Sequence, residues 1–411
     1  MPLRPLIGHL DADCFYVSCE RVRFPGLRNT PVGVLGNQGA CVIAKSYEMK
    51  ERGVRTALPI WEAQKLCPEA IYVKRDFHWY ETLSRKILDL VKEVSPAVEY
   101  YSIDELFFDA SSLTQVFRQP FLEAAKTLQG LVMEGIGIPV SIGIAPTKIL
   151  AKLISDSAKP FGVGVVLDEI SRWNLLRGKS VEDITGIAGK SRQKLEQHGI
   201  VTCEDFAKAP RALLREILTK KGEDLWWEIN GIPLQPLETQ RPYHKAISRG
   251  GSIGKASGDK VRAEAWLIRN TERLIEALQN YAFYCARVAL YLGYKDDRST
   301  FGEMNLWEPS AHFEELGPSF RMLFEKGWKS GQKLHYMHVF ALHLQFPGTY
   351  QQSLFSRKSS FTPSRSDVMK LVNARNGRFA VRSAATLPLQ DIYEDQANDY
   401  DICDIQGKLC F

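Results

Sequence analysis

The stretch Val98-Glu-Tyr-Tyr-Ser-Ile-Asp-Glu-Leu-Phe-Phe-Asp109 sets two adjacent carboxylates between apolar residues. This pattern predicts a β-hairpin with Asp104 and Glu105 near its turn. A second apolar run, Pro5–Leu10, reads as a strand that ends at Asp11. Acidic side chains on neighbouring strands repel one another unless a divalent cation neutralises them, and two Mg²⁺ ions about 3.5–4 Å apart can drive an in-line phosphoryl displacement. A polar hairpin turn without a catalytic role explains the pattern equally well.

Strand and helix signals alternate through the first 170 residues. Further strands are predicted over 31–35, 41–44, 139–144 and 163–167, and helices over 77–94, 121–133 and 147–157. This order predicts an α+β sheet that helices cover on one face. On the last of these helices, Lys148 and Lys152 are four residues apart, which is typical of a solvated helix face.

The segment from Ser171 to about Pro236 is helical in pattern, with Gly186-Ile-Ala-Gly189-Lys190 at its centre. Two helices joined by a Gly-x-x-Gly turn can present backbone N–H groups to a phosphate, because glycine lets another backbone come close. A helix hairpin with purely structural glycines would have the same sequence pattern.

Residues 241–299 hold eleven basic and six acidic side chains, a local excess equal to the net charge of +5 of the whole chain. A surface that faces phosphates and a solvated basic face both fit this charge. A helix over 261–286 and strands through residue 346 are predicted, and His335, His338 and His343 are interpreted as strand residues rather than metal ligands. After Gly348 the chain becomes rich in Ser, Gln and Arg and then acidic, so this tail is expected to be peripheral.

The 411 residues are 45% apolar and 25% charged, which excludes a fibrous repeat and a wholly disordered chain. Apolar runs are too short for a membrane span, and Asp11 and Asp13 interrupt the only stretch that resembles a signal peptide, so we expect a cytoplasmic protein. The eight cysteines form no Cys-x-x-Cys pair. Neither a disulfide framework nor a zinc site is expected.

Five segments resemble, in order, the motif set of Y-family translesion DNA polymerases: Asp11-Ala-Asp-Cys-Phe-Tyr16, Ala44-Lys-Ser-Tyr-Glu-Met-Lys-Glu-Arg-Gly53, Tyr101-Ser-Ile-Asp-Glu105, Ser141-Ile-Gly-Ile144 and Ala158-Lys-Pro160. Within this family the chain resembles bacterial DNA polymerases IV and V, and the motifs leave the subgroup open. The resemblance implies an α+β multidomain, right-hand polymerase fold. Its parts would be a ferredoxin-like palm (1–20 and 77–170), small fingers (21–76), a helical helix-hairpin-helix thumb (171–240), an α/β little finger (245–346) and a C-terminal tail (347–411).

The resemblance also implies catalytic roles. Asp11 and Asp104 would bridge two Mg²⁺ ions, with Mn²⁺ able to substitute. Glu105 would hold the ion that activates the primer 3′-hydroxyl, and the Ala12 carbonyl would complete the shell of the other. Asp13 matches the family as well but is interpreted as a structural residue at a strand end.

For substrates, the resemblance places Tyr16 as the steric gate against a 2′-hydroxyl and Tyr47, Lys50 and Lys159 on the triphosphate of the incoming dNTP. Lys50 stands where many relatives have arginine, and Ala44 where other members have a hydroxyl residue, which departs from the family pattern. Primer–template DNA would contact the thumb and the little finger, and the candidate contacts are Gly186, Gly189, Lys190, Arg249 and Lys255.

Past the predicted core, Gln351-Gln-Ser-Leu354-Phe355 matches the pentapeptide by which bacterial polymerases bind the sliding clamp. The expected partners are therefore DNA, dNTPs and the clamp, with no membrane and a protein that is otherwise monomeric. The expected activity is low-fidelity translesion synthesis within an SOS response, which makes the protein a mutator. The alternatives are a non-catalytic, clamp-bound scaffold, which the intact Asp11, Asp104 and Glu105 disfavour, and a nucleotide cyclase, which the thumb, little finger and clamp peptide disfavour.

Overall fold

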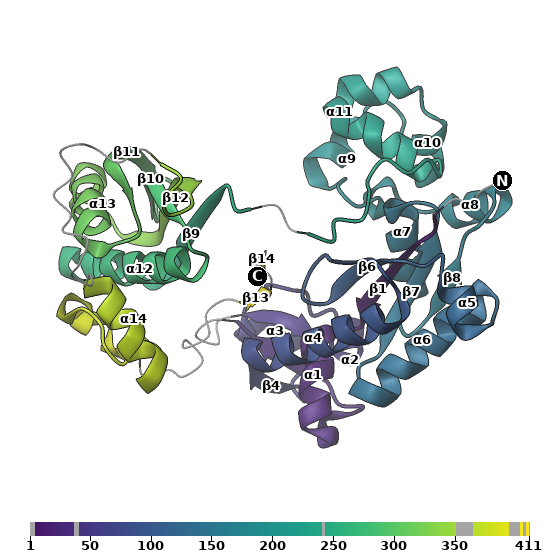
Figure 1. Ribbon diagram of the computed structural model, residues 1–411, viewed down its shortest axis with the longest axis horizontal. Helices are drawn as coiled ribbons and strands as arrows, with labels where there is room; N and C mark the ends of the chain where they lie inside the picture. Colours follow the sequence, from purple (N-terminus) through teal and green to yellow (C-terminus); the bar gives the residue numbers. More distant parts are fainter. Residues whose placement is uncertain are drawn as a thin grey trace. The chain divides into compact units, whose positions relative to one another are not determined.

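The computed structural model describes residues 5–36, 41–240, 243–350, 365–393, 403–405 and 408–410 (Figure 1). The chain divides into two units, Met1–Arg241 with Ile402–Phe411, and Pro242–Asp401. In the described ranges, no helix is long and apolar enough to cross a membrane.

A five-stranded sheet in the order β5-β6-β1-β7-β8 lies at the centre of the first unit. Its strands are β1 (Ile7–Ala12), β5 (Val98–Tyr100), β6 (Glu105–Asp109), β7 (Val140–Ala145) and β8 (Val163–Val165). β1 runs antiparallel to both β6 and β7, with Asp11 opposite Glu105 on one side and Ser141 on the other. The predicted hairpin and strands are therefore confirmed, and the sheet brings the end of β1 beside the hairpin turn.

Helices cover both faces of this sheet. They are α4 (Phe77–Val94), α6 (Phe121–Ile136) and α7 (Lys148–Ala158), and the short α5 (Leu113–Phe117) precedes α6 (Figure 1). α7 lies so close to β7 that a Cβ on Gly143 would stand 2.1 Å from the Ala151 carbonyl oxygen. Ile142 and Ile144 point the other way and are fully buried, and α6 contacts β7 and β8. The prediction of helices on one face was wrong because β7 is a central strand with both faces apolar.

A three-stranded sheet in the order β3-β2-β4 forms a smaller core beside this one. Its elements are α1 (Phe15–Arg23), η1 (Pro25–Leu27), β2 (Val32–Leu35), β3 (Val42–Lys45), α2 (Tyr47–Glu51), α3 (Ile60–Leu66) and β4 (Ile71–Lys74). Met49, Val54 and Ala63 are buried in its core. The Ser46 hydroxyl accepts hydrogen bonds from the Met49 and Val32 amides and so fixes the start of α2 on the sheet.

The helical segment that follows consists of α8 (Glu169–Leu176), η3 (Val181–Asp183), α9 (Gly189–Glu196), α10 (Cys203–Lys208) and α11 (Arg211–Ile229). The Gly-x-x-Gly segment joins η3 to α9, so the two helices that it connects are a single 3₁₀ turn and an α-helix. Ser180, just before η3, pairs with Thr202 in an isolated β-bridge.

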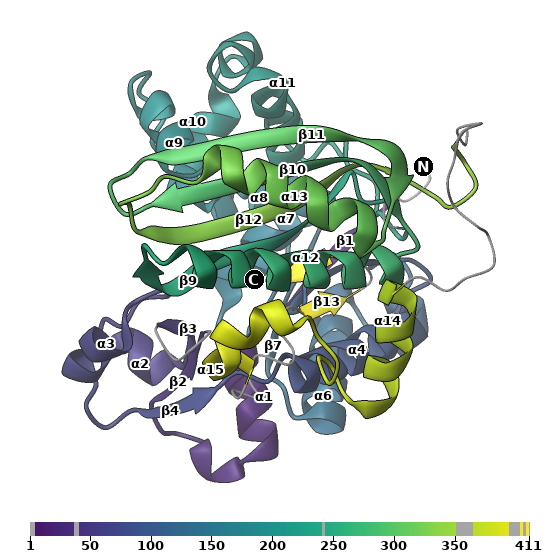
Figure 2. The same ribbon diagram turned by 90° about the vertical axis from the view of Figure 1, so that its left-hand side faces the viewer.

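The second unit has an antiparallel sheet in the order β11-β10-β12-β9 (Figure 2). Its elements are β9 (Ala246–Ser257), α12 (Lys260–Asn280), β10 (Tyr284–Tyr294), β11 (Ser299–Ser310), α13 (Phe313–Gly327) and β12 (Leu334–Gln345). The predicted helix over 261–286 ends six residues early because Ala282 adopts a left-handed conformation with φ of 54° and the next residues begin β10. The three histidines lie on β12, as predicted.

The chain then returns to this second core. Later in the sequence than the pentapeptide come α14 (Arg365–Asn376), η4 (Ala384–Leu389) and α15 (Gln390–Tyr393), and η4 packs on α12. Leu389 is fully buried and Ile392 is 7% exposed, both in the same core as the sheet. The expectation of a wholly peripheral tail was therefore wrong for these residues. The hairpin of β13 (Cys403–Ile405) and β14 (Lys408–Cys410) belongs to the first unit.

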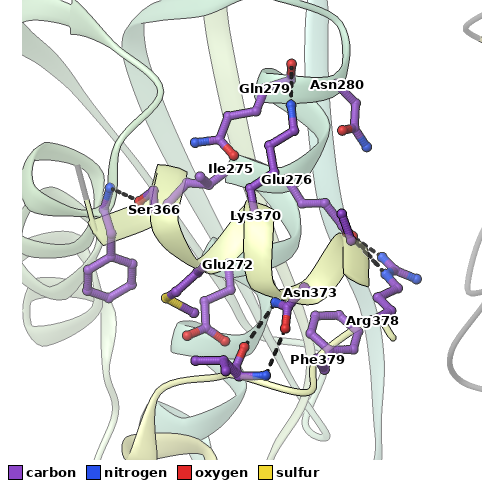
Figure 3. Close-up of a pocket in the computed structure, with 14 residues that line it drawn as sticks. Glu272, Ile275, Glu276, Gln279, Asn280, Ser366, Lys370, Asn373, Arg378 and Phe379 are labelled. Atoms are coloured by element: carbon purple, nitrogen blue, oxygen red, sulfur yellow. Dashed lines mark hydrogen bonds and ion pairs between the residues drawn. The ribbon is translucent and has the colours of Figure 1, made fainter. Parts of the chain in front are cut away.

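Between α12 and α14 lies a cavity of about 310 Å³ (Figure 3). Most polar groups on its wall are already paired: Arg378 with Glu276 at 2.6 Å, and the Asn373 side chain with the Val381 backbone. Lys370 donates to the Gln279 carbonyl oxygen at 3.3 Å. The Lys370 contact joins α14 to α12, and the Arg378–Glu276 pair joins the residues after α14 to the same helix.

Candidate active site

Three carboxylates meet where β1 ends beside the β5–β6 turn. Asp11 pairs with Glu105 across the strands, and the Ala12 amide donates to the Asp104 carbonyl oxygen at 2.9 Å. Asp11 is 3% exposed and lies on the sheet face that α7 covers. His9, two residues earlier on the same face, has its Nδ1 2.6 Å from the Ser155 hydroxyl of α7. The backbone thus gathers the three residues that the sequence pattern singled out.

Lysines from the α7 side contact these carboxylates. Lys159 Nζ lies 2.7 Å from Asp11 Oδ2, and Lys152 Nζ lies 2.5 Å from Glu105 Oε1 and 3.9 Å from Asp11 Oδ2. Asp156 stands beside both, 3.6 Å from Lys152 and 3.2 Å from Lys159. The site is a compact group of alternating charges.

The prediction that Lys148 and Lys152 form a solvated face was wrong. Lys148 is buried and pairs with the buried Glu99 on β5, and the Lys152 side chain is only 13% exposed. Their spacing does put them on one face of α7, but Ser155 on the same face contacts His9. That face packs on the sheet, where the carboxylates compensate the lysine charges.

Burial above all, with the charges of Glu105 and Asp104, raises the pKa of Asp11 to about 8 against the opposing charge and hydrogen bond of Lys159. Burial also raises the pKa of Asp104, although a 2.5 Å hydrogen bond from the Ser102 hydroxyl opposes this. Burial lowers the pKa of Lys159, but the charge and hydrogen bond of Asp11 outweigh it, so the net shift is upward. The site therefore stabilises added positive charge near its carboxylates.

The donor chemistry at this site fits a divalent cation. Asp11, Asp104, Glu105 and the Ala12 carbonyl offer only oxygen, which Mg²⁺ prefers. Across the residues that the structure describes, no group of three or more His, Cys, Asp or Glu side chains is arranged around one point as a metal site. In this structure the ammonium groups of Lys159 and Lys152 pair with the carboxylate oxygens of Asp11 and Glu105 instead.

Of the expected nucleotide contacts, Lys159 touches Asp11, and the other three lie on the helices α1 and α2. The Tyr16 ring stacks on Tyr80 with centroids 4.6 Å apart and an interplanar angle of 17°, and the edge of Phe77 supports it. Tyr47 opens α2, and the exposed Lys50 places its ammonium 5.8 Å from the Tyr47 ring centroid. These positions put an aromatic ring, a hydroxyl and a cation next to the strand end.

Lys45, on β3, was missed by the sequence reasoning. It is partly buried, donates to the Thr56 hydroxyl at 2.8 Å, and burial together with the charge of Lys50 lowers its pKa. Two mutually repelling cations indicate a place that accepts an anion. The only signal in the sequence is its position directly after Ala44 in the second motif.

Asp13 is 1% exposed and its carboxylate accepts several hydrogen bonds. The donors are the Ser141 hydroxyl at 3.1 Å, the Phe161 amide at 2.7 Å and the Tyr47 hydroxyl at 3.4 Å. Burial raises the pKa of Asp13, while the Phe161 and Ser141 hydrogen bonds lower it. These contacts agree with the interpretation of Asp13 as a structural residue.

The candidate DNA contacts fall into two groups. Gly186, Gly189 and Lys190 are exposed, and both glycines have positive φ, 100° and 36°. On β9, Lys255 is exposed but Arg249 is 8% exposed and donates to the Ser248 carbonyl oxygen. The Arg249 side chain is therefore largely buried in this structure, and its role as a DNA contact stays a prediction. Gln351, Leu354 and Phe355 lie outside the described residues.

Comparison with known proteins covers most of the chain. Residues 10–156 match the impB/mucB/samB family and residues 244–354 match the C-terminal domain of that family. DNA polymerase IV of Oceanobacillus iheyensis is 32% identical over 330 residues, which span 79% of this chain and 77% of the relative. DNA polymerase IV 1 of Bacillus subtilis is 29% identical over 392 residues, 94% of each chain.

Solved structures share the fold. A Y-family DNA polymerase chimera superposes with a TM-score of 0.69 at 22% identity, covering 83% of this chain and 99% of the chimera. DinB from Sulfolobus solfataricus superposes with a TM-score of 0.55 at 23% identity, covering 82% and 98%. The carboxylates at the strand end, the order of the motifs and these relatives agree: the chain belongs to the Y family of translesion DNA polymerases and is a DNA-directed DNA polymerase.

Proposed function

We propose that this enzyme copies damaged template DNA with low fidelity by nucleotidyl transfer that depends on two divalent metal ions, Mg²⁺ being the physiological ion and Mn²⁺ able to substitute. The observation that carries the proposal is the group formed by Asp11, Asp104 and Glu105. Three carboxylates lie beside one buried strand end, and burial above all raises the pKa of Asp11 to about 8, which supports a site that gains from added positive charge.

In this proposal Asp11, Asp104, Glu105 and the Ala12 carbonyl would hold the two ions, and all four donors are oxygen. Bound there, the ions would lower the pKa of the primer 3′-hydroxyl and neutralise charge at the transferred phosphorus. Asp104 also keeps its hydrogen bond from Ser102, which orients one of its oxygens. Because such an oxygen is already oriented, the site would need less rearrangement of its side chains when a metal ion binds.

Lys159, Tyr47 and Lys50 bind the triphosphate of the dNTP. Lys159 now pairs with Asp11, so an incoming triphosphate offers it a second set of anionic partners. Lys50 is exposed and contributes a point charge where a guanidinium would contribute a bidentate contact. The ammonium and hydroxyl groups thereby draw the phosphates toward the same strand end that carries the carboxylates.

Tyr16 acts as the steric gate. Its ring is held by stacking on the fully buried Tyr80, so it has little freedom to move away from a 2′-hydroxyl. A fixed ring rejects a ribose through overlap, whereas a mobile ring would accommodate it.

The chain divides in this proposal into a palm (1–20 and 77–170), fingers (21–76), a thumb (171–240) and a little finger that begins at residue 245. Gly186, Gly189, Lys190 and Lys255 contact the phosphates of primer–template DNA. Gln351, Leu354 and Phe355 bind the sliding clamp, and the protein is otherwise a cytoplasmic monomer that acts as a mutator within an SOS response. The packing of 365–393 on α12 extends the little finger beyond residue 346.

Primer extension with purified protein, Mg²⁺ and dNTPs on intact and abasic templates tests the proposal. Asp104→Ala and Glu105→Ala should abolish incorporation, and EDTA should do the same to the wild type. Binding of primer–template DNA, measured by fluorescence anisotropy, should persist, because it depends on basic residues elsewhere. Asp109→Asn, at the opposite end of β6, is the control and should retain incorporation. Wild-type turnover by either alanine variant would refute the assignment.

A further inference from the structure

Asp13 connects three separate segments of the first unit. Its backbone amide donates to the Pro139 carbonyl oxygen at 2.9 Å, and its carbonyl oxygen accepts from the Ser18 hydroxyl at 2.6 Å. These bonds fix the residue at the junction of β1 and α1. Its carboxylate is therefore held in place before it contacts anything else.

The carboxylate reaches two segments that carry proposed nucleotide contacts. Oδ1 accepts from the Tyr47 hydroxyl at 3.4 Å, at the start of α2, and Oδ2 accepts from the Phe161 amide at 2.7 Å, two residues after Lys159. Ser141, which donates to both oxygens at 3.1 and 3.2 Å, lies opposite Asp11 in the sheet. One buried group thus links Tyr47 and the Lys159 segment to the strand end that bears Asp11.

The Asp13 carboxylate serves these partners as a hydrogen-bond acceptor. A hydroxyl, a backbone amide and a second hydroxyl all converge on Asp13, and an ionised carboxylate accepts from all of them at once. An amide in its place would turn an N–H₂ toward one of these groups and lose a charge-assisted hydrogen bond.

We propose that Asp13 is a positioning residue for the incoming nucleotide: it holds the Tyr47 side chain and the backbone beside Lys159 in place, the two segments that carry the proposed triphosphate contacts, while touching neither substrate nor reacting atoms. The inference rests on the proposed function, because it assumes those two contacts. It assigns to Asp13 a role in dNTP affinity that goes beyond support of a strand end.

Steady-state kinetics on the full-length enzyme separate positioning from simple stability. Asp13→Asn should raise KM for dNTP roughly tenfold, as expected for one lost charge-assisted hydrogen bond. The affinity for primer–template DNA should stay within about twofold of wild type, since its contacts lie elsewhere. The matched control is Asp109→Asn, which also removes a strand-end carboxylate that accepts a backbone amide, at 2.9 Å from Ser111, and should leave KM for dNTP unchanged.

A double-mutant cycle tests the route of the effect. If Asp13 acts partly through Tyr47, the combined effect of Asp13→Asn and Tyr47→Phe on KM for dNTP should be smaller than the product of the single effects. If the asparagine variant does not fold, KM for dNTP is measured on Asp13→Ser. The serine hydroxyl can accept hydrogen bonds from only some of the Tyr47, Phe161 and Ser141 donors.

Two reference variants tell the failures apart. If Tyr47→Phe and Lys159→Met leave KM for dNTP unchanged, the proposed triphosphate contacts are wrong. If those two variants raise KM but Asp13→Asn and Asp13→Ser do not, the positioning role is overturned while the proposed function stands. An Asp13 variant that weakens DNA binding and dNTP use in parallel also overturns it, because that result indicates general destabilisation.

Discussion

Replacing Leu389 by alanine should destabilise the second unit although the residue lies past the predicted core. Leu389 is fully buried against α12. Removing a completely buried leucine side chain costs about 3 kcal/mol, from lost apolar burial and the cavity left behind. Leu387, in the same 3₁₀ helix, is 60% exposed, so Leu387→Ala should change stability by less than about 0.5 kcal/mol.

Hydrogen exchange resolved to peptides provides the assay. Amides exchange when the structure around them opens. Where that opening exposes Leu389, a loss of about 3 kcal/mol makes exchange roughly 150-fold faster. We expect this acceleration in peptides from η4, α15 and the facing side of α12 in Leu389→Ala, with Leu387→Ala unchanged. Equal, small effects of the two variants, or α12 protection that does not respond, would show that residues 384–393 do not belong to the core.

Three further outcomes are expected. Tyr16→Ala should reduce the preference for dNTPs over ribonucleotides by roughly 10- to 100-fold in single-nucleotide incorporation, and an unchanged preference would place the gate elsewhere. Replacing Leu354 and Phe355 together by alanine should weaken clamp binding by roughly 100-fold or more at an unchanged melting temperature, since each side chain contributes about 1.5–3 kcal/mol when buried by a partner; a destabilised variant that still binds the clamp would contradict this. Lys148→Met should lower the free energy of unfolding by about 3 kcal/mol by leaving Glu99 without its buried partner, and the further change Glu99→Leu should recover much of it. A single variant as stable as the wild type in urea would refute that last expectation.

Local pattern sufficed for most strands and helices of the first unit. The helix predicted over 77–94 has these bounds in the structure because Asp76 caps its first turn and its apolar residues repeat at helical spacing. The end of the helix in the second unit was missed by six residues. Ala282 adopts a left-handed conformation there, which an alanine in the sequence does not predict.

The carboxylates could be found from sequence because each follows a recognisable strand and matches a motif. Their partners could not. Lys152 and Lys148 have the spacing of a solvated face, and only the packing of α7 on the sheet shows that they meet Glu105 and Glu99. The same holds for the burial of Arg249, whose charge favours a surface position.

Because the chain returns to the second core after the pentapeptide, the pentapeptide does not follow the last core residue in the sequence. β12 ends at Gln345 and α14 begins at Arg365, and both belong to the second unit, so the pentapeptide lies in the sequence between two elements of one unit. A partner that binds the pentapeptide would therefore bind the chain before its last core residues, and not after them. A stop codon placed after residue 346 would remove both the recognition peptide and Leu389, so a truncation phenotype would combine lost recruitment with an opened core.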